Sequence, residues 1–464
     1  MKTKLKFLLA LGAFTILLSC TKDELSPDVM DESSIAEDLA LKNYNNGMIK
    51  SYSSETLVKW NVLLGSMVDE KMPPPPESKI YAMVTLAIHD ALNNVVPKYE
   101  TYALNNTMTD ASYVSKKNIT ALADAAVSQA ARDVMVAMFP ASATSADALL
   151  TQIVMAIEDE ASKEKGIEIG KAAASAILQK RQGDFAFVFS AYTAPSNEPG
   201  IYQADYPPYA FPNPPIWPAN AIFTANLGDL QPFGIKSSDQ FLAGVPYAVY
   251  TQEYTDDYNE IKSLGCINCP ARTEEQTQIR DFWFEHTASS FNRIARTLID
   301  REDLNGWEAA RLIALIEMSQ FDSYIASFEE KDHFKYWAPF TAIRRGDADG
   351  NPNTVGDASW ATLRPTPPIY EFPSTASYAA GASAEILRQF FGTDNYTLTV
   401  TSPYYVPGVE RTMKSFSQIS YEQGLSRIFL GHHYRHSSNV GEENGIELGR
   451  YVFENNLREL KKIK

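Results

Sequence analysis

Apolar residues recur with the 3.6-residue period of an α-helix along most of this chain, and no segment alternates with a strand period over more than a few residues. Residues 80–89 are apolar on all sides, as in a buried helix. Residues 121–138 are rich in alanine and end before Pro140. One face of a long helix is marked by Trp307, Leu312, Ile316, Phe321, Ile325 and Phe328. These patterns predict an all-α fold.

Proline density and one internal repeat suggest how the chain is divided. Residues 195–218 contain eight of the 26 prolines, which disfavours helix and strand interiors and predicts an irregular belt. Gly-Ile-Glu-Ile-Gly at residues 166–170 returns as Gly-Ile-Glu-Leu-Gly at residues 445–449. Two related helical bundles would leave such a repeat, and chance is the alternative. We expect an N-terminal bundle over 55–190, a connecting belt over 191–235 and a C-terminal bundle over 236–464.

The N-terminus has the organisation of a targeting segment. A basic stretch precedes an apolar run, residues 7–18, that is too short to span a membrane. The run ends in Leu-Leu-Ser-Cys, which resembles the lipobox of bacterial lipoproteins and implies removal of residues 1–19 and lipidation of Cys20. An uncleaved anchor or an ordinary secretion signal is the alternative.

The polar, acidic residues 20–54 are expected to form a tether. Thr-Lys-Asp-Glu after Cys20 resembles the surface-export signal of lipoproteins from the Bacteroidetes phylum. This resemblance implies an outer-membrane lipoprotein of the cell envelope, with the periplasmic or surface side left open. The net charge of −16 disfavours a nucleic-acid partner, because the surface repels phosphate backbones. The sequence does not indicate an oligomeric state.

The two remaining cysteines, Cys266 and Cys269, are close in sequence. In a protein outside the cytoplasm, such a pair is most simply a structural disulfide. The alternatives are a redox motif, which normally lies at a strand-to-helix junction, and a zinc site, which needs further ligands at matching spacing. Neither context is visible in the sequence.

Three clusters in the C-terminal half, residues 331–344, 370–391 and 426–434, resemble the vanadium-dependent haloperoxidases and the related type 2 phosphatidic acid phosphatases. The family pattern is Lys, six residues, Arg-Pro; then Pro-Ser-Gly-His; then Ser-Arg, five residues, His. The matching residues here are Lys331, Ser374, Arg427 and His433. The resemblance extends over about residues 55–455.

This resemblance implies a pocket for an oxyanion, which needs fixed positive charges and N–H donors. Lys331 and Arg427 supply charge, and Ser374 can cap the next helix, where the N–H of Thr375 faces the anion. A helix break at Gly431 can return His433 to the side of Arg427. In the family, the corresponding His is the phosphorylated nucleophile of phosphatases and the vanadium ligand of haloperoxidases.

The chain departs from the family pattern at two positions. Ala338 replaces the Arg of the first motif, and Ala376 replaces the His that acts as general acid–base. Loss of a charged donor costs about 1.5–3 kcal/mol of binding, and loss of a general acid costs about 10²–10⁴ in rate. Residues near these gaps that could substitute are Arg344, Arg345, His333, Lys335, His432 and His436.

Two further patterns indicate weaker metal hypotheses. His432 and His436 are four residues apart and would face a metal together on a helix, although Gly431 and the polar residues around them favour a loop. Residues 347–351 resemble the start of a calcium loop, but no Glu stands at the twelfth position, which favours a polar turn. Neither supports a metal other than vanadate bound at His433.

We therefore expect a divergent relative of these enzymes that binds phosphate or vanadate and acts as a phosphoric ester hydrolase or a vanadium-dependent haloperoxidase. Its partners would be a small phosphorylated or oxyanion substrate and the membrane, through the lipid on Cys20. The alternative is a non-catalytic envelope lipoprotein that keeps the fold for binding or scaffolding.

Overall fold

The structure is a computed structural model that describes residues 47–460 apart from 109–112, 185–186, 205–208, 211–215 and 243. The predicted targeting segment and Cys20 lie outside the described residues, as does most of the tether. Helices make up most of the described chain, so the all-α prediction is confirmed. Within the described residues, no helix is both long enough and apolar enough to cross a membrane.

The first half of the chain forms one group of helices. They are α2 (Glu55–Val68), α3 (Pro74–Val95), α4 (Ile119–Met138), α5 (Ala143–Met155) and α6 (Glu160–Lys180). Helix α3 is buried along nearly its whole length, and α4 packs between α3 and α6. Short 3-10 helices lie at Ile49–Ser51, Pro140–Ser142, Leu227–Asp229 and Gly346–Ala348.

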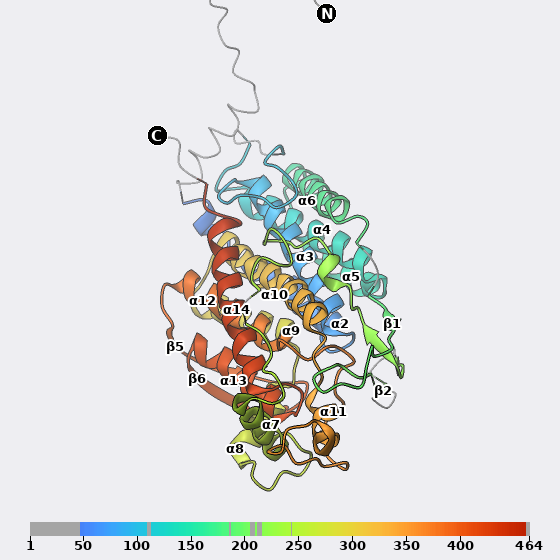
Figure 1. Ribbon diagram of the computed structural model, residues 1–464. Coiled ribbons are helices and arrows are strands. Elements are labelled where there is room, and N and C mark those ends of the chain that lie inside the picture. Colours follow the sequence, from blue (N-terminus) through green and yellow to red (C-terminus); the bar gives the residue numbers. More distant parts are fainter. Residues whose placement is uncertain are drawn as a thin grey trace, which may run out of the picture.

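The second half forms the remaining helices. They are α7 (Gln252–Leu264), α8 (Glu274–Phe282), α9 (Thr287–Arg301), α10 (Gly306–Phe334), α11 (Pro339–Arg344), α12 (Thr375–Phe391), α13 (Phe416–Phe429) and α14 (Arg435–Asn455). Helices α12, α13 and α14 lie side by side on the opposite side of the molecule from α4, α5 and α6 (Figure 1).

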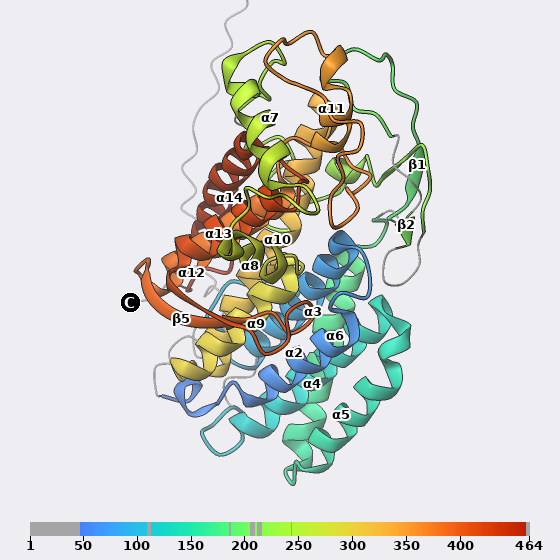
Figure 2. The ribbon, with the colours of Figure 1, turned by 90° about the horizontal axis from the view of Figure 1, so that it is seen from below.

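Helix α10 joins the two groups. It packs against α3 on one side and against α12 and α14 on the other, and it runs through the centre of the view in Figure 2. The sequence predicts one apolar face for this helix, but nearly all of its residues are buried because helices surround it. One continuous apolar core includes residues of α3, α4, α10, α12 and α14. The two bundles therefore share a core.

The internal repeat marks the same kind of helix contact in both groups. A Cβ atom built on Gly166 or Gly170 of α6 would lie 2.5 Å from a backbone oxygen of α4. In α14, a Cβ atom on Gly445 would lie 2.0 Å from the Tyr378 oxygen of α12, and one on Gly449 would lie 2.4 Å from the Ala382 oxygen. Only glycine permits such a close approach of helix backbones.

Replacing Gly445 by alanine is therefore expected to destabilise the protein by about 1–3 kcal/mol, because neither backbone can move away from the added methyl group. Gly424 of α13 provides the matched control, since a Cβ atom there would meet its nearest neighbour at an ordinary 3.5 Å. Gly424→Ala should leave stability unchanged or raise it slightly through helix propensity. Urea unfolding measures the stability of both variants. An equal loss of stability in the two would show that the close packing at Gly445 does not cause the effect.

The strands are short and pair in antiparallel twos: β1 (Phe189–Ala191) with β4 (Ala221–Phe223), β2 (Tyr209–Ala210) with β3 (Ile216–Trp217), and β5 (Asn395–Thr401) with β6 (Glu410–Ser415). The prediction that the proline-rich segment contains no strand is wrong at β2 and β3, where two-residue strands form. The sequence analysis also missed the β5–β6 hairpin, although Thr-Leu-Thr-Val-Thr at 397–401 alternates in burial as a strand does.

Candidate functional site

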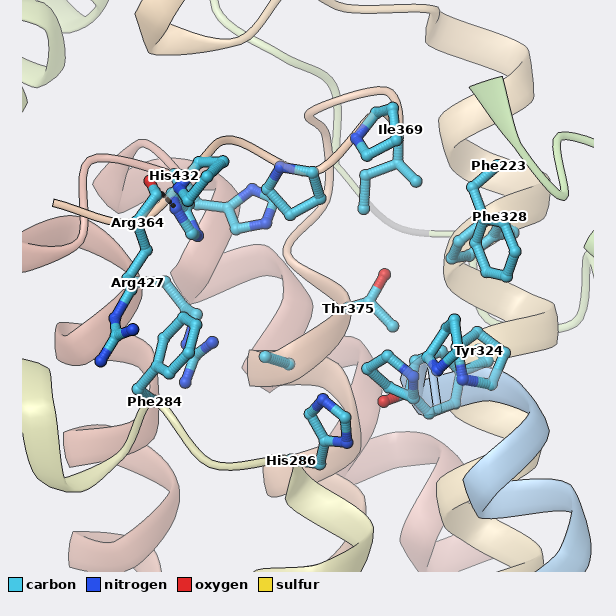
Figure 3. A pocket seen from close by; sticks show the side chains of 18 of the residues that line it. Phe223, Phe284, His286, Tyr324, Phe328, Arg364, Ile369, Thr375, Arg427 and His432 are labelled. Atoms are coloured by element: carbon cyan, nitrogen blue, oxygen red, sulfur yellow. Dashed lines mark hydrogen bonds between the residues drawn. The ribbon is translucent and has the colours of Figure 1, made fainter. Parts of the chain in front are cut away.

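A cavity of about 190 Å³ opens where several distant segments meet. It is lined by Pro73, Pro74, Pro75, Phe223, Phe284, His286, Tyr324, Phe328, Arg364, Pro365, Pro367, Pro368, Ile369, Thr375, Ala376, Tyr405, Arg427, His432 and His433. Arg364, Arg427 and His432 lie on one side, and Phe223, Phe328 and Tyr324 lie on the other (Figure 3). The cavity thus has a basic side and an apolar side.

The turn between α13 and α14 brings Arg427 and His433 to this cavity. Helix α13 ends at Phe429, and Gly431 adopts a left-handed backbone with φ +77°. The N–H groups of His432 and His433 both donate to the carbonyl of Arg427, at 3.0 and 3.3 Å. The chain therefore folds back over the helix end, which is the geometry that the spacing of Arg427 and His433 predicts.

Gly431 is required at this turn for a second reason. A Cβ atom on Gly431 would lie 2.6 Å from the carbonyl oxygen of Gly265. The adjacent Cys266 and Cys269 form a disulfide. The N–H groups of Arg272 donate to the carbonyls of Leu264 and Cys266, at 2.7 and 2.6 Å. The small disulfide ring and Arg272 thus support the turn that carries His433.

His433 is held by Glu371, which precedes α12. His433 Nδ1 lies 3.0 Å from Glu371 Oε1, and the same oxygen accepts the N–H of Tyr434 at 3.1 Å. Burial raises the pKa of Glu371 to about 7; when Glu371 is ionised, Oε1 can only accept, so Nδ1 of His433 is the donor and Nε2 keeps its lone pair. Burial, with Lys331 and Arg427 nearby, holds the pKa of His433 well below its ordinary value, so the ring is neutral.

Arg427 is a buried cation held mainly by neutral groups. Its guanidinium donates to the Trp283 carbonyl, to Ser426 Oγ at 3.0 Å and to Gln423 Oε1 at 3.5 Å. No carboxylate among the described residues forms an ion pair with it. Burial lowers its pKa to about 10, which still leaves it charged at neutral pH. Glu70 stabilises this charge only through space, and a buried cation without a directly paired carboxylate favours an anionic ligand.

The sequence resemblance predicts that Lys331 and Ser374 contact the anion. Neither side chain is among the described residues that line the cavity. Lys331 Nζ donates to the carbonyls of Tyr370 and Glu371, both at 2.9 Å, and to that of Pro373. Burial lowers the pKa of Lys331 to about 7. It therefore holds the segment that leads into α12.

Ser374 is the N-cap of α12, as the sequence predicts. Its Oγ accepts the N–H of Ser377 at 3.4 Å and the Ser377 hydroxyl at 2.9 Å, and it is fully buried. The first residues of the helix, Thr375 and Ala376, line the cavity instead. Thr375 Oγ1 is 2.8 Å from Ser327 Oγ. The N-terminus of α12 thus lies at the cavity, and free N–H groups and the helix dipole at a helix N-terminus favour an anion.

The two positions that depart from the family pattern differ in placement. Ala376 lines the cavity, whereas Ala338 is buried at the N-cap of α11 and is not among the described lining residues. The candidate substitutes Arg344, Arg345, His333, Lys335 and His436 are also outside that lining. His432 does line it, but its Nε2 bonds to the Arg364 carbonyl at 3.2 Å, and burial lowers its pKa to about 3.

Two cavity residues that the sequence analysis missed, His286 and Tyr405, form hydrogen bonds with glutamate side chains. His286 Nδ1 is 2.9 Å from Glu77 Oε2, and Tyr405 donates to Glu70 Oε2 at 2.7 Å. Burial opposes protonation of His286, but Glu70 and Glu77 raise its pKa to about 9. These acidic neighbours thus favour the protonated form of His286. No spacing in the sequence links it to Arg427, because the two lie on different helices.

The metal hypotheses drawn from the sequence find no support in the side-chain arrangement. His436 stacks on Tyr247 at 3.8 Å and bonds to the Val245 carbonyl, so it does not face a metal with His432. Within the described part of the chain, no group of three or more His, Cys, Asp or Glu side chains could hold a metal ion.

Comparison with known proteins gives consistent relatives. Residues 311–462 match the family model of the VCPO second helical-bundle domain. Vanadium chloroperoxidase from Curvularia inaequalis is 24% identical over 78% of this chain and 74% of its own length. The first bacterial vanadium-dependent iodoperoxidase superposes with a TM-score of 0.70 at 20% identity, covering 88% of this chain and 99% of that one. A bacterial vanadium-dependent chloroperoxidase in its holo form superposes with a TM-score of 0.64 at 16% identity, covering 82% and 92%.

Proposed function

We propose, from the similarity to the vanadium haloperoxidase superfamily, that the cavity binds phosphate or vanadate and that it hydrolyses phosphate monoesters with His433 as the nucleophile. One observation carries the proposal. A neutral histidine, with Nε2 as its lone-pair nitrogen, lines the same cavity as an arginine without a carboxylate partner among the described residues. The N-terminus of a 17-residue helix reaches the same cavity.

These groups suit the steps of phosphoryl transfer. Arg427 and the N–H groups at the start of α12 would neutralise the non-bridging oxygens. His433 Nε2 would form a bond to phosphorus while the bond from phosphorus to the alcohol oxygen breaks, and the electron pair leaves with that oxygen. A proton from water completes the alcohol. A second water would then attack phosphorus and cleave the N–P bond, and the proton that it releases neutralises the hydroxide left by the first water. Phosphate departs, which restores His433.

Glu371 would serve this sequence by positioning His433. Its carboxylate fixes which ring nitrogen carries the proton, and it stabilises the positive charge that develops on the ring when Nε2 bonds to phosphorus. Lys331 would act one step further away, because it holds the backbone of Glu371 and Pro373.

Vanadate is a tetrahedral oxyanion like phosphate, and the same groups could hold it. His433 Nε2 would be its ligand, with Arg427 and the start of α12 around its oxygens. Bound vanadate supplies the oxidation of halide by peroxide in the relatives whose names state it. With Ala376 at the position of the acid–base histidine, this chain lacks that proton donor for peroxide, so we assign vanadate the role of a competing ligand.

A non-catalytic binding protein is the second candidate, and Ala338 and Ala376 favour it. Both hypotheses are compatible with a cell-envelope lipoprotein, anchored through Cys20 in the outer membrane, that takes a small phosphorylated partner. They differ only in turnover.

Replacing His433 by alanine is expected to abolish hydrolysis of p-nitrophenyl phosphate, because it removes the nitrogen that would attack phosphorus, while the other neutral ring in the cavity, His432, is bound to the Arg364 carbonyl. Vanadate should inhibit the wild-type reaction. His333→Ala is the matched control, since His333 is exposed and outside the described lining. Phosphate release is measured for all three proteins.

Equal background release by wild type and His433→Ala would remove the phosphatase hypothesis and leave the binding protein. Calorimetry tests a third possibility, namely that the cavity binds no oxyanion. No heat with phosphate or vanadate at millimolar concentration would remove the oxyanion site itself.

A further inference from the structure

We propose that Arg364 is the second guanidinium of the anion site and takes over the charge that the superfamily motif places at residue 338. This inference rests on the proposed oxyanion site and deepens it, because it assigns a binding residue that is absent from the three motifs. It also predicts that the site prefers a doubly negative tetrahedral ligand.

The backbone of Arg364 is fixed beside the turn that carries His433. His432 Nε2 donates to the Arg364 carbonyl at 3.2 Å, and the low pKa of His432, caused by burial, keeps its ring neutral. Arg364 and Pro365 line the cavity together. The segment that contains Arg364 is therefore attached to the residue next to the proposed nucleophile.

The guanidinium of Arg364 is held by aromatic rings. It lies 4.8 Å from the ring centre of Phe284 and 5.5 Å from that of Tyr405. No carboxylate among the described residues forms an ion pair with it, whereas Arg388 of α12 pairs with Glu385. Stacking engages the face of a guanidinium and leaves its N–H edge for a ligand, which is how arginine binds phosphate in a bidentate manner.

Arg364 and Arg427 lie on the same side of the cavity. In Figure 3 the ends of the two side chains lie near Phe284, whose ring is seen between them. Tyr405 is within electrostatic reach of both guanidinium groups. Two arginines and the N-terminus of α12 would then surround one anion, which matches the charge of a phosphate or vanadate dianion better than Arg427 alone.

Residue 338 cannot supply the positive charge that the superfamily motif places there, because it is an alanine. Ala338 begins α11, is buried, and is not among the described residues that line the cavity. Arg344, at the end of α11, donates to the Trp360 carbonyl at 3.1 Å instead. Arg364 is the only arginine besides Arg427 among the described lining residues.

The test is calorimetric titration of the full chain with inorganic phosphate and with vanadate. Arg364→Gln should bind both about 10- to 100-fold more weakly, the usual effect of losing a charged hydrogen-bond donor. Arg364→Lys keeps the positive charge but cannot bind phosphate in a bidentate manner, so its affinity should lie between those of Arg364→Gln and wild type. Arg388→Gln, which removes an arginine distant from the cavity lining, is the charge-matched control and should bind as wild type does.

Thermal unfolding provides the second readout. Without ligand, Arg364→Gln should unfold close to wild type, and the rise in Tm produced by phosphate should shrink with the affinity. Binding by Arg364→Gln within twofold of wild type, while Arg427→Gln loses binding, would overturn the role of Arg364 and leave the oxyanion site intact. Absence of binding by wild type would overturn both proposals. If Arg364→Gln does not fold, the Arg364→Lys titration decides, and unchanged affinity there would refute bidentate binding.

Discussion

Replacing Ala376 by histidine is expected to raise the rate of hydrolysis of alkyl phosphate monoesters by about 10²–10⁴-fold, the usual contribution of a general acid. Ala376 lines the cavity at the start of α12 and is only partly buried, so a larger side chain has space there. In the reaction proposed for wild type, the departing alkoxide would take its proton from water, and the rate should therefore fall steeply as the pKa of the alcohol rises. A histidine at this position would supply that proton.

The choice of ester makes this prediction specific. Nitrophenolate leaves readily without protonation, so p-nitrophenyl phosphate should gain far less from Ala376→His than an alkyl ester does. The double variant Ala376→His with His433→Ala should be inactive on both esters. An equal gain on both, or a gain that survives the loss of His433, would show that the introduced ring does not act as a proton donor to the leaving group.

Replacing Lys331 by methionine is expected to destabilise the protein by about 3–5 kcal/mol, because it leaves three buried carbonyl groups without their donor and the buried Glu371 without its neighbouring cation. Those carbonyls belong to Tyr370, Glu371 and Pro373, which lead directly into the cap of α12. Phosphate binding should weaken as well, since Glu371 positions His433. Urea unfolding and calorimetry on the same variant measure the two effects.

The changes in stability and in phosphate binding of Lys331→Met distinguish two roles for Lys331. The sequence resemblance predicts an anion ligand, whose loss would weaken binding with little effect on stability. The hydrogen bonds indicate a support for the segment before α12, whose loss affects stability first. A Lys331→Met protein that unfolds like wild type but binds no phosphate would restore the ligand role.

Several features of the site could be predicted from the sequence because they depend on neighbours along the chain. A glycine after Arg427 ends the helix and returns His433 to its side, and this follows from local backbone geometry. Ser374 as a helix cap follows from its residue type and from the helical pattern after it. The superfamily motifs could also be predicted from the sequence, because the residues of each motif are close together in the chain.

Tertiary structure alone decided the rest of the cavity. His286 and Arg364 lie on separate segments, and only the packing of α9, α12 and the α13–α14 turn brings them near Arg427. Tertiary structure also decided that Lys331 contacts carbonyl groups, because these contacts depend on how the segment before α12 is folded.

The sequence by itself determined an all-α chain and the turn that joins Arg427 to His433, since periodicity, glycine position and turn chemistry act over a few residues. Which charges reach one anion was decided by long-range packing. That choice depends on the distances between side chains far apart in the chain, and no local spacing encodes those distances.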